Sequence, residues 1–146
     1  MVGQADSVTR WEDICRMEFH YTVESSQSLD DTIVMLEREL AERKFGVLWH
    51  FDLAAKLREK GQAIAGEYRV LEVCNPAEAA NILGLNELAG YFLPCKIVVY
   101  GIEGKTRIGL PKPTVLIGVL GDDALKSIAD HVEATLVEAI DRCVAQ

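Results

Sequence analysis

The hydrophobic pattern of this chain changes several times between a period of two and a helical period. Residues 17–24 alternate apolar and polar side chains, which is typical of a half-exposed strand. From Ser28 to about Lys44 the apolar residues recur at helical spacing, and Ser28 is placed to cap that helix. A longer stripe of the same kind follows Asp122. The pattern therefore predicts two long amphipathic helices, each with one apolar face.

Shorter elements fill the chain between these helices. Asp52 is expected to cap a short helix that ends at Gly61. Asn75 is expected to cap a second helix, which begins at Pro76 and breaks at Gly84. Glu103 and Gly104 form a predicted hairpin turn. The remaining apolar runs are expected to be strands, at residues 45–51, 68–73, 97–100, 106–110 and 115–120.

This order of elements predicts an α+β fold with a mainly antiparallel sheet, two long helices packed on one face and short helical insertions. We expect a single α+β domain over residues 17–146, preceded by an N-terminal lead-in at residues 1–16. The uncovered face of the sheet is expected to carry His20, Thr22 and His50. Such a half-apolar face favours a binding surface or a contact in a homodimer.

Charge and composition exclude several classes of partner. The chain has 15 basic and 23 acidic residues and a net charge of -8, which opposes binding to nucleic acid. No apolar run reaches the ~20 residues that cross a bilayer, and the N-terminus does not resemble a signal peptide. We expect a cytoplasmic protein with no nucleic-acid or membrane partner.

The four cysteines lie far apart and include no Cys-x-x-Cys pair. In a reducing compartment we expect free thiols rather than disulfides, and no metal site, because the spacing does not match a zinc motif. The positions are Cys15, Cys74, Cys95 and Cys143.

Cys74 immediately precedes the predicted helix cap at Asn75 and the helix start at Pro76. A sulfur near the N-terminus of a helix is expected to have a lowered pKa, and its thiolate would support redox or sulfur chemistry. The alternative is that Cys74 is a small buried hydrophobic residue at the end of a strand.

Cys95 follows Pro94, whose fixed φ angle would hold the sulfur at a defined place at the start of a strand. The helix after Asn75 must return the chain to the same sheet, which would bring both cysteines to one end of it; a coincidental placement is the alternative, and the one favoured by the sequence alone. His20 and His50 are further candidates for a ligand or acid–base role, and simple solvation is the alternative for each.

Three motifs resemble those of the domain of unknown function 302 family: Cys74-Asn75-Pro76, Leu93-Pro94-Cys95 and the strand Val98-Val99-Tyr100. The resemblance implies a small domain with a TATA-binding-protein-like sheet (β-α-β4-α) and frequent dimers. It implies no biochemical activity, because the family has none assigned.

Three hypotheses on function follow. The first is thiol-based redox or sulfur handling through Cys74 and Cys95. The second is a non-catalytic module that binds a small molecule or a metal, and the third is a structural or interaction protein whose cysteines only pack. No cofactor is identified by these residues.

Overall fold

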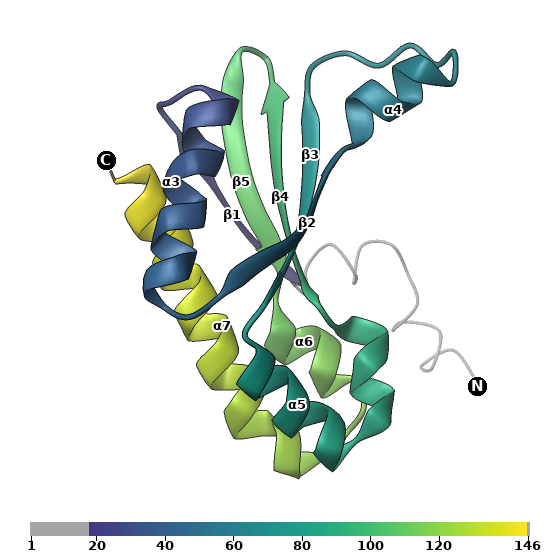
Figure 1. The fold of residues 1–146 in the computed structure, drawn as a ribbon, viewed down its shortest axis with the longest axis vertical. Helices are drawn as coiled ribbons and strands as arrows, with labels where there is room; N and C mark the ends of the chain where they lie inside the picture. The colour runs from purple at the N-terminus through teal and green to yellow at the C-terminus, as the bar shows by residue number, and fades with distance from the viewer. Residues whose placement is uncertain (1–17, 146) are drawn as a thin grey trace, which may run out of the picture.

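The computed structural model describes residues 18–145, so the predicted lead-in and Cys15 lie outside the described residues. One five-stranded sheet has the strand order β1-β5-β4-β3-β2, and every neighbouring pair is antiparallel (Figure 1). The strands are β1 (His20–Ser25), β2 (Gly46–Asp52), β3 (Tyr68–Cys74), β4 (Cys95–Ile102) and β5 (Lys105–Pro111).

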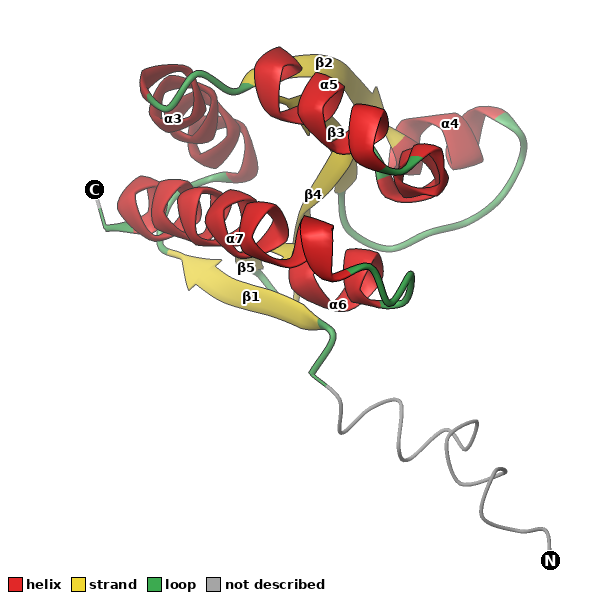
Figure 2. Cartoon of the chain, turned by 90° about the horizontal axis from the view of Figure 1, so that it is seen from below, coloured by secondary structure: helices red, strands yellow, loops and turns green. Residues whose placement is uncertain are grey.

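Two long helices, α3 (Leu29–Glu42) and α7 (Asp123–Val144), lie on the same side of this sheet (Figure 2). The α+β fold class, with helices packed against an antiparallel sheet, is confirmed. The shorter helical elements are α4 (Leu53–Glu59), α5 (Pro76–Leu85), the 3-10 helix η1 (Glu87–Phe92) and α6 (Pro113–Gly118).

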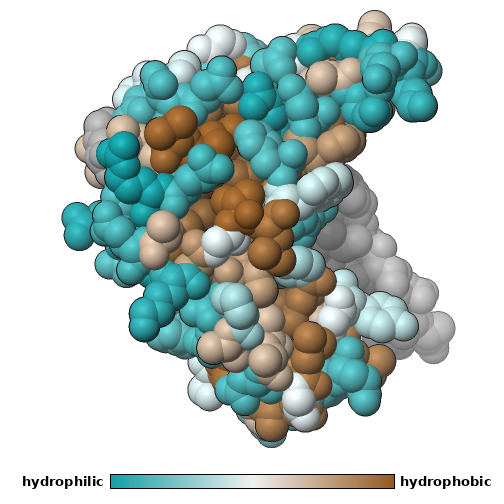
Figure 3. Space-filling view, in the orientation of Figure 1, coloured by the Kyte–Doolittle hydropathy of each residue, from teal (hydrophilic) through white to brown (hydrophobic). Residues whose placement is uncertain are grey.

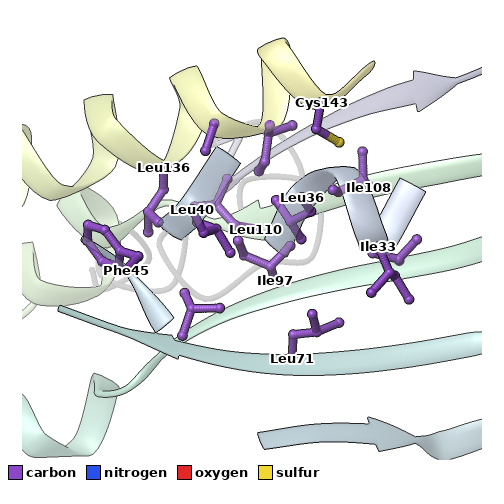
Figure 4. Packing of buried hydrophobic residues seen from close by; sticks show 14 of the residues in the cluster. Ile33, Leu36, Leu40, Phe45, Leu71, Ile97, Ile108, Leu110, Leu136 and Cys143 are labelled. Atoms are coloured by element: carbon purple, nitrogen blue, oxygen red, sulfur yellow. The ribbon is translucent and has the colours of Figure 1, made fainter. Parts of the chain in front are cut away.

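The main core lies between the sheet and the two long helices (Figure 4). Leu36 of α3 and Leu136 of α7 are fully buried, and they belong to the same cluster as Ile97 of β4. Burying one such side chain contributes roughly 1.5–3 kcal/mol. The apolar stripes predicted for both helices are therefore the surfaces that cover the sheet.

The predicted helix starts are confirmed at four positions. Ser28, Asp52, Asn75 and Asp122 each accept a hydrogen bond from a backbone amide in the first turn of the following helix. These bonds satisfy amides that have no partner within the helix.

A second, smaller core lies beyond one end of the sheet, at the bottom of Figure 1, where α5, η1, α6 and the first turns of α7 meet. Its buried members are Ile82, Ala89, Ile117, Leu125 and Ala129. Apolar side chains also reach the surface at this end, as Figure 3 shows. The short helices thus form a cap over the strand ends.

The strand predicted at residues 115–120 is wrong, because α6 (Pro113–Gly118) occupies most of this segment. Pro113 occupies the first turn of the helix, where its missing N–H costs nothing. The ladder with β1 had already ended at Pro111. A short apolar run does not distinguish a buried strand from a buried helix, which is the reason for the error.

The position predicted for His50 is also wrong. A register shift between Val47 and Trp49 interrupts the alternation of β2, and His50 then pairs with Leu71, which is buried in the main core. Directly opposed residues share a face of the sheet, so His50 lies on the helix-covered side. His20 and Thr22 pair with Pro111 and Gly109 on the uncovered side, which we call the open face.

The helix break predicted at Gly84 is wrong as well, because α5 continues through this residue to Leu85. A glycine inside a helix costs about 1 kcal/mol relative to alanine, which packing of a neighbour such as Ile82 offsets.

Replacing Gly109 with Ala is expected to destabilise the protein. A Cβ at Gly109 would lie 2.4 Å from Thr22 Oγ1 and 2.6 Å from the Tyr21 carbonyl oxygen, so β1 would have to shift. Overpacking of this kind costs roughly 1–3 kcal/mol. Urea denaturation measures the change, and Gly46→Ala is the control, since a Cβ there meets nothing within 4 Å. Equal stability of the two variants would contradict the prediction.

Candidate functional site

The two cysteines of the conspicuous motifs lie at the same end of the sheet. Cys74 is the last residue of β3 and Cys95 is the first residue of β4, and Cys95 pairs with Val73. The antiparallel register therefore brings together two residues that are separated by α5 and η1 along the chain.

A small cavity of about 20 Å³ lies at this end, and both cysteines line it. Asn75 and Pro94 also line it, while Ile117 of α6 contributes from the second core. Its size corresponds to about one water molecule. This cavity has no room for a larger ligand, and both cysteines that line it are partly buried.

Asn75 determines the electrostatics beside Cys74. Its Oδ1 accepts from the amides of Ala77 at 3.0 Å and Glu78 at 3.1 Å, and its carbonyl oxygen accepts from Ala79 at 2.9 Å. Pro76 has no N–H to donate. The donors of the first turn are thus used by Asn75 and are not left for a thiolate.

Burial raises the pKa of Cys74, contrary to the lowered pKa expected from its position beside a helix start. Burial also raises the pKa of Cys95 to about 12, with smaller contributions from the negative charges of Cys74 and Glu72. Cys143, packed in the main core, has a pKa raised to about 11, mainly by burial. These thiols are protonated at neutral pH.

A larger pocket of about 270 Å³ opens on the other side of Cys95. We call it the cysteine-end pocket. Its walls come from β3, η1, the start of β4, the end of β5 and α6, and most of its side chains are apolar. The lining residues are Glu72, Tyr91, Phe92, Leu93, Pro94, Cys95, Lys96, Pro111, Pro113, Leu116 and Ile117.

The pocket contains one pair of opposite charges. Lys96 Nζ lies 3.7 Å from Glu72 Oε2, and the lysine side chain is 50% exposed whereas the glutamate is 19% exposed. The carboxylate is therefore the inner charge, and the flexible lysine is the outer one. This pair and the α6 wall were missed from the sequence, although Pro113 at a helix start was a usable signal.

The predicted site residues fall into two groups. Cys74, Asn75, Pro94 and Cys95 meet at the small cavity, and Pro76 starts the helix beside it. The histidines line neither this cavity nor the cysteine-end pocket. His20 Nδ1 lies 2.8 Å from Thr22 Oγ1 on the open face. His50 Nε2 is 3.4 Å from Arg69 Nη1 on the other side of the sheet, so the two histidines form no joint site.

The model of the family described as "Domain of unknown function DUF302" matches residues 21–143. The chain belongs to the DUF302 family. A solved structure that resembles this DUF302 chain is the crystal structure of an uncharacterized conserved protein DUF302 from Bacillus stearothermophilus. It is 52% identical, with a TM-score of 0.84, and the match covers 86% of this chain and 98% of that one. None of the curated proteins matches.

Residues 18–145 of this DUF302 protein contain no group of three or more His, Cys, Asp or Glu side chains arranged to hold a metal ion. No helix among them has the length and apolar character that a membrane span requires.

Replacing Asn75 with Ala is expected to lower the free energy of unfolding by about 1 kcal/mol, because two amides of α5 lose their acceptor. Asn75→Asp is the matched control, since aspartate caps a helix equally well. Chemical denaturation compares the two variants. An alanine variant as stable as the aspartate variant would show that this cap contributes nothing.

The raised pKa of Cys95 predicts a loss of stability at alkaline pH. In the folded protein the pKa of this thiol is about 12, whereas the pKa of the thiol in the unfolded chain is 9.0. Its contribution is thus complete below pH 9.0 and disappears as the pH rises toward about 12. Melting temperatures measured from about pH 8 to about pH 10.5 should fall less in Cys95→Ser than in the unmodified protein. An identical fall in both proteins would contradict this assignment.

Proposed function

We propose that this protein is a non-catalytic binding module that holds a small, mainly apolar molecule in the cysteine-end pocket. The observation that carries the proposal is the pocket itself, a hollow of about 270 Å³ with lining residues from five separate elements, β3 among them through Glu72. Small-molecule sites are typically concave, mostly apolar and supplied with few polar groups. Both its size and its lining fit a compact ligand.

Polar recognition in this pocket would come from Lys96 and Glu72. Their separation of 3.7 Å is longer than a direct charge-assisted hydrogen bond, and the lysine is half exposed. The pair is therefore weak, and a polar group of a ligand would compete with it at little cost. An apolar body would then lie against Phe92, Pro113 and Leu116.

Thiol chemistry through Cys74 and Cys95 is the second candidate. One observation favours it: both residues line the same small cavity. The raised pKa values of both thiols oppose it, because the thiolate is the reactive form. For this reason we rank ligand binding first.

A homodimer and a cytoplasmic location stay predictions. The argument for a dimer is the open face of the sheet, which no element of residues 18–145 covers; a dimer through that face is the alternative to a ligand bound there. Light scattering tests it against the mass of one chain, 16.1 kDa.

Fluorescence titration with N-phenyl-1-naphthylamine, a compact apolar probe, tests the proposed function. We expect saturable binding that Leu116→Trp reduces at least about tenfold, because the indole fills the pocket. Val119→Trp is the matched control, since this residue directly follows α6, is 73% exposed and does not line the pocket.

Circular dichroism establishes that both variants are folded. Equal probe binding by the two variants, or no saturable binding by the unmodified protein, would refute the proposed function.

A further inference from the structure

The cysteine-end pocket adjoins two hollows on the open face of the sheet, with which it is linked through shared lining residues. The first hollow, of about 350 Å³, shares Lys96 and Pro111 with the pocket. The second, also of about 350 Å³, shares His20, Thr22 and Tyr100 with the first. Together the two hollows form what we call the open-face groove, which begins at the mouth of the pocket.

Small residues form the floor of this groove. Val98 of β4 pairs with Gly109 of β5, which in turn pairs with Thr22 of β1, so the three lie in line across the sheet. Gly109 has no side chain, and the close approach of β1 excludes a larger residue there. The depression is thus imposed by the packing of β1 against β5.

Aromatic pairs stand at the two ends of the groove. Tyr68 and Tyr100 stack with ring centroids 5.2 Å apart at the hairpin end. Phe19 and His20 make an edge contact at 5.1 Å at the pocket end, where His20 pairs with Pro111. Both pairs are held by contacts within the protein, so they are in place before a ligand arrives.

The groove follows β4 away from the cysteine-end pocket. Lys96 marks one end and Tyr100 the other, and both lie on β4 with four residues of rise between them, roughly 13 Å. A groove of this shape, adjoining an apolar pocket, fits an extended chain better than a compact molecule.

Charge differs between the two ends of the groove. At the pocket end Lys96 has one carboxylate partner, Glu72. At the hairpin end Arg107 and Lys105 share a single carboxylate, that of Glu24, at 3.7 and 3.8 Å. These three side chains together carry one excess positive charge in a chain whose net charge is -8. Arg107 and Glu24 both line this end of the groove, whereas Lys105 does not, so an anionic group at Arg107 would compete with Glu24 for the guanidinium.

We propose that the ligand is a long-chain carboxylate, with its apolar tail in the cysteine-end pocket, its chain along the open-face groove and its carboxylate at Arg107. This inference rests on the proposed function, because the tail occupies the same pocket. It adds the length of the ligand, its charge and its orientation.

Competition against N-phenyl-1-naphthylamine by octanoate, laurate and palmitate tests the proposal. Each methylene that leaves water strengthens binding about fourfold, so palmitate is expected to bind at least about a hundredfold more tightly than octanoate. Octanoate fits the pocket alone and serves as the reference for it.

Val98→Trp blocks the floor of the groove without altering the pocket lining. It is expected to weaken the binding of palmitate at least about tenfold, which corresponds to the loss of about two buried methylenes. The affinity for octanoate should stay within about twofold of that of the unmodified protein. Val34→Trp on α3 is the control, because this side chain is 50% exposed and lies away from the groove. It should change the binding of neither palmitate nor octanoate.

Arg107→Gln tests the position of the carboxylate. It is expected to weaken palmitate roughly three- to tenfold, because a charge-assisted contact is lost, and to leave the uncharged hexadecanol unchanged. A loss that is equal for palmitate and hexadecanol would overturn the assignment of the carboxylate to Arg107.

The outcomes separate this proposal from the proposed function. If neither the probe nor octanoate binds, the proposed function and the groove proposal are both refuted. If the probe and octanoate bind, only the groove proposal is refuted by either of two results: palmitate binding no more tightly than octanoate, or Val98→Trp weakening the binding of the two acids equally. A second copy of the chain covering the groove would also overturn it, seen as a dimer mass that Val98→Trp disrupts and palmitate does not.

Discussion

Within residues 18–145, the structure depends on burying one face of the antiparallel sheet. Leu36 of α3 and Leu136 of α7 are fully buried against the strands, and burial of apolar surface is the largest favourable contribution to folding. Because both long helices lie on that side, the strands need apolar residues at alternate positions only. The other positions are free to carry the small floor and the aromatic pairs of the groove. Stability and the proposed ligand recognition thus use opposite faces of the same strands.

The cap at Asn75 illustrates how a local requirement limits the chemistry of a neighbour. A helix start must satisfy its free amides, and Asn75 does so with its own side chain and carbonyl oxygen. The sulfur of Cys74, one residue earlier, is therefore partly buried without amide donors that would stabilise its thiolate. As a result the pKa of Cys74 is raised. A cysteine beside a helix N-terminus is activated only when the amides there remain unused. In this chain the cap that fixes the geometry of the cysteine end leaves the Cys74 thiol with a raised pKa and therefore protonated at neutral pH.

Most of the fold could be predicted from the sequence because its signals are local. The four caps, the hairpin turn and the stripes of α3 and α7 depend on residues within a few positions of one another. What could not be predicted depends on contacts between distant segments. The bulge that turns His50 to the helix side is set by pairing with β3, and α6 is chosen over a strand by the end of the ladder with β1. The cysteine-end pocket joins Tyr91, Lys96 and Leu116 from three elements, a set that no spacing in the sequence connects.

The bulge in β2 also affects how the protein behaves toward other chains. β2 is an edge strand of the sheet, and its exposed residues include Leu48 and Trp49, which are 61% and 53% exposed. A regular edge with such side chains would offer a template for an incoming strand, the first step toward aggregation. The irregular step between Val47 and Trp49 interrupts that template and increases the local twist. The bulge that places His50 on the helix-covered side therefore also disfavours pairing of the apolar edge strand β2 with strands of other chains.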